Sequence, residues 1–215
     1  MPRKSTKTTD KNGKKIGKDD DKMFYIDPAE ELRKRGIYYI TDEIETDSLI
    51  DIHQDIILKH LDPQWTDDIQ IVINSVGGSC AEAWAIVDLL DWIRMDVKTT
   101  AIGECCSMGA LLTACGTRGK RLASPNSIIM IHDPWISHVK GNVHELADID
   151  KVMKDEQARH TRFWIKHSNC TTEGEVEKLM LNNRDNYMTP EEAVKYGIID
   201  GIVGQEKPKV KGGKK

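Results

Sequence analysis

The feature that most constrains the fold of this chain is a predicted strand that turns sharply into a helix at Ser107. The β-branched run Val97–Ile102 predicts a buried strand, and the small-residue run Met108–Ala114 predicts a buried helix. A serine at such a turn holds its hydroxyl at a helix N-terminus, where free N–H groups favour negative charge. A nucleophilic serine needs these surroundings, although capping a helix is the commoner use of a serine there.

The segments before this turn alternate between predicted strands and helices. Strands are predicted at Ile37–Ile40 and Ile69–Ile73, and helices at residues 47–61 and 79–95. Asn74–Gly78 is predicted to end the second strand. Buried strands separated by helices indicate a parallel α/β sheet, which binds ligands at the carboxyl ends of its strands. The glycine pair and the serine both stand at such ends.

The second half of the chain contains further strand ends and one long helix. Strands are predicted at 120–123 and 127–131, with His132 directly after the second. The helix from Glu145 to His167 has only a thin apolar stripe, which predicts that it projects from the body and is covered by a neighbouring chain. The remaining predicted elements are helices at 172–181 and 189–197, a strand at 198–203 and a short helix at 28–35.

Composition and charge exclude several classes of protein. No apolar stretch reaches the roughly 18 residues of a membrane span, and no secretory signal is recognised, so a cytoplasmic protein is expected. The five cysteines predict reduced thiols, and neither they nor the histidines show the spacing of a metal site. Residues 1–22 and 205–215 each carry a net charge of +4, which predicts two disordered basic tails around one domain, 23–204. Such tails usually confer solubility, so a nucleic-acid partner is not expected.

Three chemically capable side chains stand at predicted element boundaries: Ser107, His132 and Asp185. A serine nucleophile needs a base, and histidine suits that role near neutral pH. The histidine in turn needs a carboxylate that fixes its tautomer. Taken singly, His132 also fits a core histidine, and Asp185 a turn or cap residue.

From about Ile37 to Val203 the sequence resembles ClpP, the family of proteolytic subunits of the Clp proteases. The resemblance implies a ClpP/crotonase-like α/β fold of repeated strand–helix units, with a projecting helical handle at about 134–170. The segments that carry it are Ile73–Gly78, Gly103–Ala110, Gly119–Arg121, Pro125–Ser127, Met130–His132, Arg184–Met188, Glu191–Ala193, Tyr196–Gly197 and Asp200.

The resemblance also implies roles for individual residues. Ser107 is implied as the nucleophile, His132 as the base and Asp185 as the carboxylate that orients it. The backbone N–H groups of Gly78 and Met108 are implied as the oxyanion hole. The chemistry needs no cofactor and no metal.

The function implied is a serine endopeptidase that cleaves unfolded polypeptides inside a chamber of stacked heptameric rings. An AAA+ unfoldase is the implied partner, and no membrane partner is expected. Three alternatives stay open: a phage capsid-maturation protease of the same fold, a catalytically silent ring subunit, and an enoyl-CoA hydratase-like enzyme of the same superfold. Reaction with a fluorophosphonate separates the proteases from the hydratase-like enzyme, and turnover by the isolated protein separates them from the silent subunit.

The chain departs from the family pattern in four places. Val76 stands where the family usually has proline, and Cys105 and Cys106 replace small alanine-like residues beside the serine. Both cysteines are interpreted as packing residues, because a buried thiol behaves as a small hydrophobe. Residues 134–142 lack the glycine-rich turn that commonly follows the histidine, and residues 1–36 do not resemble the family's axial loops.

Overall fold

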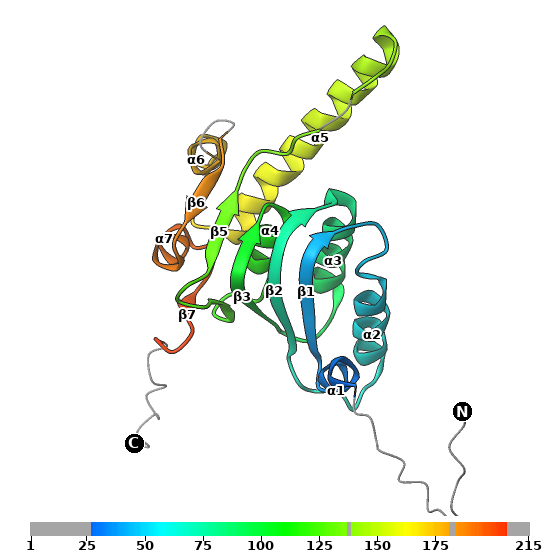
Figure 1. Cartoon of the computed structure of the whole chain (residues 1–215), viewed down its shortest axis with the longest axis vertical. Coiled ribbons are helices and arrows are strands. Elements are labelled where there is room, and N and C mark those ends of the chain that lie inside the picture. The colour runs from blue at the N-terminus through cyan, green and yellow to red at the C-terminus, as the bar shows by residue number, and fades with distance from the viewer. Residues whose placement is uncertain (1–26, 137–138, 181–183, 206–215) are drawn as a thin grey trace, which may run out of the picture.

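A computed structural model describes residues 27–136, 139–180 and 184–205 (Figure 1). The basic tails predicted for 1–22 and 205–215 lie outside these residues, apart from residue 205. Within the described ranges, no helix combines the length and the apolarity that a bilayer crossing requires.

A seven-stranded sheet forms the centre of the fold, and its main path runs in the order β1-β2-β3-β4-β7. Every strand pair is parallel except that of β5 with β6. The predicted parallel α/β architecture is therefore confirmed. The strands are β1 (Ile37–Ile44), β2 (Ile69–Gly78), β3 (Val97–Cys106), β4 (Arg121–Ala123), β5 (Ile128–Ile131), β6 (Asn186–Met188) and β7 (Gly201–Ile202).

Helices connect and cover these strands, and one of them, α5, extends far beyond the sheet as an arm (Figure 1). The helix after the serine, α4, packs on β2 and β3, and each of its residues is buried. The helices are α1 (Pro28–Lys34), α2 (Ile50–Leu61), α3 (Cys80–Trp92), α4 (Met108–Ala114), α5 (Val143–His167), α6 (Glu173–Leu179) and α7 (Pro190–Tyr196).

The strands β2 and β3 are longer than predicted. Asn74–Gly78 does not end β2, because the pairing with β1 continues to Gly78 after a shift of register. Likewise β3 continues beyond Ile102 to Cys106, where it pairs with β5. Pairing with a neighbouring strand holds glycine-rich and polar residues extended, although their sequence alone indicates a turn.

The short strands complete the sheet in a way that the sequence did not show. The neighbouring strands β4 and β5 do not pair with each other, since both pair with β3, one after the other. The sequence did not predict β6, which pairs with β5 in the antiparallel sense. The strand predicted at 198–203 shrinks to β7, because the N–H groups of Ile198 and Ile199 donate to the Ala193 carbonyl at the end of α7.

An ion pair joins β4 to the segment before β7, and its arginine is fully buried while its aspartate is partly exposed. The Arg121 side chain is 1% exposed, and its guanidinium donates to both carboxylate oxygens of Asp200, Nε to Oδ2 at 2.9 Å and Nη2 to Oδ1 at 2.6 Å. Arg121 Nη1 also donates to the carbonyl oxygen of His167 at 2.6 Å. Burial alone would raise the pKa of Asp200, but its hydrogen bonds and proximity to Arg121 hold that pKa below the ordinary value.

The variant Asp200→Asn is expected to lose about 3 kcal/mol of unfolding free energy, because it leaves the buried guanidinium without its counter-charge. Since the pKa of Asp200 is lower in the folded chain than its ordinary value of 3.8, this stabilisation is complete at neutral pH and declines as the pH falls below about 4. Urea unfolding at pH 7 and pH 3 measures both effects. The control is Asp96→Asn, which removes an exposed partner of Lys120 and should cost less than about 1 kcal/mol.

The apolar residues of α5 fall into two groups that differ in how far they are exposed to solvent. Phe163 and Trp164, at 5% and 1% exposure, pack inside the chain's own core. Leu146 and Val152, at 43% and 64% exposure, stand on the projecting outer half of α5, residues 143–155. The expectation that a neighbouring chain covers the whole stripe is therefore wrong for the two aromatic residues. It stays a prediction for the outer half.

Candidate active site

The backbone and side chain of Ser107 do not have the geometry of an ordinary helix N-cap. Ser107 lies between β3 and α4 with φ 53° and ψ −123°, a strained conformation for a residue other than glycine. Its N–H donates to the carbonyl oxygen of Met130 at 2.7 Å, which fixes the turn against β5. Its side chain makes no capping hydrogen bond to α4. The ordinary N-cap use of this serine is therefore excluded.

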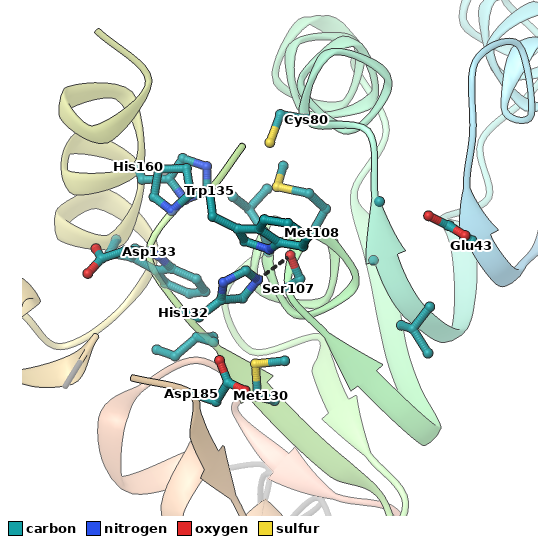
Figure 2. Close-up of a pocket in the computed structure, with 17 residues that line it drawn as sticks. Glu43, Cys80, Ser107, Met108, Met130, His132, Asp133, Trp135, His160 and Asp185 are labelled. Carbon is teal, nitrogen blue, oxygen red and sulfur yellow. Dashed lines mark hydrogen bonds between the residues drawn. The ribbon is translucent and has the colours of Figure 1, made fainter. Parts of the chain in front are cut away.

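His132 follows the end of β5 and faces the serine. The pairing of Cys106 with Met130 sets β5 beside the last residues of β3, which brings the two side chains together. The Nε2 atom of His132 lies 2.8 Å from the Oγ atom of Ser107, within hydrogen-bonding distance (Figure 2). A neutral imidazole can accept the hydroxyl proton across this distance.

Asp185 comes to the same place through the strand that the sequence did not predict. In the antiparallel pairing of β5 with β6, Ile131 is opposite Asn186, so the next pair outward is His132 with Asp185. Asp185 is exposed and lines the same cavity as the other two residues. It makes no hydrogen bond to His132 in the described part of the chain. Hydrogen bonds between catalytic groups are often completed only when substrate binds.

Gly77 allows the end of β2 to approach the serine turn closely. It has φ +96°, and a Cβ atom there would lie 2.6 Å from Ser107 Cβ and 3.0 Å from the nitrogen of Met108. No side chain fits in that space. The N–H of Gly77 is already engaged, because it donates to Ser75 Oγ at 3.1 Å.

Gly78 presents its N–H on the opposite side of β2 from β1. The Ile44 carbonyl accepts from the N–H of Ser79, and in a parallel ladder the N–H groups of successive residues point to opposite sides. A Cβ on Gly78, whose φ is +142°, would collide with the backbone of Ile44. The N–H of Met108 has no acceptor within its own helix, because it is the first residue of α4. Two backbone donors are thus available beside the serine.

These residues surround one cavity of about 770 Å³ at the carboxyl ends of β2, β3 and β5 (Figure 2). Sequence reasoning missed some of the residues that line it, including Cys80 and His160, which carry no local motif. The lining residues are Glu43, Val76, Gly77, Gly78, Cys80, Ser107, Met108, Leu111, Met130, Ile131, His132, Asp133, Pro134, Trp135, His160, Trp164 and Asp185.

The two cysteines beside the serine are buried and poorly suited to nucleophilic attack. Cys105 is 0% exposed and Cys106 is 5% exposed. Burial raises the pKa of the Cys105 thiol to about 11, and burial together with the charge of Glu104 raises the pKa of Cys106. Since the thiolate is the reactive form, both side chains should be inert near neutral pH.

The variant Cys106→Ala is therefore expected to keep peptide cleavage within about threefold of the unchanged protein, because a small apolar residue replaces an unreactive thiol of similar size. A fluorogenic peptide assay measures this, and alkylation with iodoacetamide under native conditions should leave activity intact. Rapid loss of activity that follows modification of Cys106 would contradict the interpretation as a packing residue.

Two comparisons with known proteins bear on the family of the chain. The family model for Clp protease matches residues 7–206, which extends the resemblance beyond the segment 37–203 recognised from motifs. The chain is also similar to the ATP-dependent Clp protease proteolytic subunit 2 of Corynebacterium jeikeium (strain K411), with 34% identity over 188 residues that cover 84% of each chain. Fold, site geometry and both matches lead to one conclusion: the chain belongs to the Clp protease family.

Proposed function

We propose that this chain is a serine endopeptidase that cleaves polypeptides by acyl transfer through Ser107. The observation that carries the proposal is the 2.8 Å hydrogen-bonding distance between His132 Nε2 and Ser107 Oγ, in a cavity large enough for a peptide segment. Membership of the Clp protease family supports the same activity.

In the proposed mechanism, Ser107 Oγ attacks the peptide carbonyl carbon while His132 Nε2 takes the hydroxyl proton. Asp185 holds the other ring nitrogen of His132 in its protonated form and stabilises the imidazolium. The N–H groups of Gly78 and Met108 donate to the oxyanion as it develops. His132 then protonates the leaving amine, and water, activated by the same histidine, releases the acyl group.

The direct test is labelling of the purified chain with a fluorophosphonate probe, followed by peptide mapping. We expect one label per chain, on Ser107, because the probe reacts with activated serines only. A hydratase-like enzyme or a catalytically silent ring subunit would not react. The Ser107→Ala variant is the matched control, and labelling that persists in it would contradict the assignment.

We further propose that the chain assembles into stacked rings, acts on unfolded chains delivered by an AAA+ unfoldase and works in the cytoplasm. The similar protein is named an ATP-dependent proteolytic subunit, which supports the first two points. The outer half of α5 supports assembly independently: it carries exposed Leu146, Val152 and Val143, the last at 74% exposure. A second copy of the same helix would remove these side chains from water.

The variant Leu146→Asp/Val152→Asp is expected to give smaller particles with unchanged circular dichroism and at least tenfold lower cleavage, because buried charge opposes the helix contact. Native mass spectrometry and a fluorogenic peptide assay measure the two effects. Lys151→Asp, an exposed change of charge on the same helix, is the control and should keep the assembly. Trp164 is not a suitable probe, since its loss would damage the chain's own core. Particles of unchanged mass in the double variant would refute the contact.

A further inference from the structure

A group of three potential metal ligands lies in the cavity wall and has no part in the proposed reaction. Cys80 is the first residue of α3, and Glu156 and His160 lie one helical turn apart on α5. The Cys80 Sγ atom, a Glu156 carboxylate oxygen and a His160 ring nitrogen all lie within 4.8 Å of one another. Figure 2 shows Cys80 at the start of α3 and His160 on α5, both above Ser107 in the view.

The Nε2 atom of His160 is a buried hydrogen-bonding atom that has no hydrogen-bond partner among the described residues. The side chain of His160 is 7% exposed. Its Nε2 atom lies 3.3 Å from Glu156 Oε1, and burial lowers the pKa of His160 while the charge of Glu156 opposes that shift. A buried nitrogen without a partner is costly, and a neutral imidazole is the form that ligates metals.

Glu156 is held in place by two other residues. Trp84 Nε1 donates to Glu156 Oε1 at 2.5 Å, and the guanidinium of Arg159 lies 3.1 Å from Oε2. A carboxylate has about four lone-pair sites, so each oxygen can still accept a metal ion. Such outer contacts orient ligands in metal sites. The Arg159 side chain is 50% exposed and is screened by solvent, so its charge opposes a cation only weakly.

We propose that Cys80, Glu156 and His160 bind one divalent metal ion of the zinc class, with the fourth coordination position open to the cavity. The mixed sulfur, nitrogen and oxygen donor set suits Zn²⁺, and three protein ligands with an open position are characteristic of accessible zinc sites. Tetrahedral coordination sets such atoms about 3.5 Å apart, so the observed spacing needs only side-chain adjustment to close on an ion.

The charges balance when the ion binds. The Cys80 thiol is protonated at neutral pH, because burial, followed by the charge of Glu156, raises its pKa to about 11. Binding releases that proton to solvent, and the resulting thiolate and the Glu156 carboxylate neutralise the two charges of the ion. The ion would also tie the start of α3 to α5 beside the serine.

The proposal is tested on the full-length chain, stripped of metal with a chelator and titrated with Co²⁺ and then with Zn²⁺. We expect one Co²⁺ per chain, with a sulfur-to-cobalt charge-transfer band in the near ultraviolet and tetrahedral bands in the visible, all displaced by Zn²⁺. Saturating Zn²⁺ should also raise the melting temperature, because only the folded chain holds the three ligands together. Neither readout depends on peptidase activity.

Variants identify the ligands. Cys80→Ser should abolish the charge-transfer band and weaken Zn²⁺ binding by more than the roughly 10–100-fold that loss of an outer contact costs. Glu156→Gln and His160→Gln should weaken it similarly, with circular dichroism verifying that each variant folds. Cys170→Ser, which removes another buried thiol, is the matched control and should bind normally. Binding below one ion per chain, or equal binding by Cys80→Ser and Cys170→Ser, would overturn the proposal.

Discussion

The variant Ser107→Ala is expected to lower peptide cleavage by on the order of 10⁶-fold while the fold persists, since members of a Ser-His-Asp set act as one unit. Without Oγ there is no acyl-enzyme, and only binding and the oxyanion donors remain. Removing the hydroxyl should cost little stability, because it caps no helix and, among the described residues, its hydrogen bond is to His132 alone. A fluorogenic peptide assay beside urea unfolding separates the two effects.

The matched control is Ser48→Ala, an exposed serine before α2, which should change neither cleavage nor stability. Cleavage by Ser107→Ala within tenfold of the unchanged chain would contradict the serine mechanism. The double variant Ser107→Ala/Cys106→Ala would then tell whether the neighbouring thiol had taken over.

The variant Asp185→Asn is expected to reduce kcat by about 10³–10⁴-fold with little change in KM. An amide in this position can favour the wrong tautomer of His132 and does not stabilise the imidazolium. The expectation rests on the pairing of β5 with β6, which sets residue 185 opposite residue 132. Steady-state kinetics with a fluorogenic peptide measure kcat and KM separately.

Asp133 provides a matched control, because it is a second carboxylate in the same cavity. Its Oδ1 atom accepts a hydrogen bond from Gln157 Nε2 at 2.8 Å, so it is engaged with α5. Asp133→Asn should therefore keep kcat within about tenfold. The reverse result, with Asp185→Asn active and Asp133→Asn inactive, would assign the orienting role to Asp133.

Local sequence determined most of the elements and two of the site's positions. The capping boxes at Thr172 and Thr189 begin α6 and α7 as predicted, and Gly197 ends α7 with φ 72°. These signals act within a turn of helix, so no distant residue needs to be known. The same holds for Ser107 and His132, which stand directly at the ends of strongly apolar strands.

Strand partners were decided by the tertiary structure, because pairing depends on segments far apart in the chain. Nothing near Asn186–Met188 identifies a strand, since only its pairing with β5 makes it one. Asp185 therefore reaches the cavity through a contact that no local pattern encodes. The close approach of Gly77 to the serine turn arises in the same way, from the packing of β2 beside β3.

The group formed by Cys80, Glu156 and His160 depends on the fold most completely. Along the chain, several strands of the sheet lie between Cys80 and the other two residues, Glu156 and His160. The spacing of the three residues in the sequence therefore resembles no metal motif. The sequence accordingly predicted no metal site. Only the packing of α5 against the start of α3 brings a thiol, a carboxylate and an imidazole together, because tertiary contacts follow from burial of apolar faces and not from order along the chain.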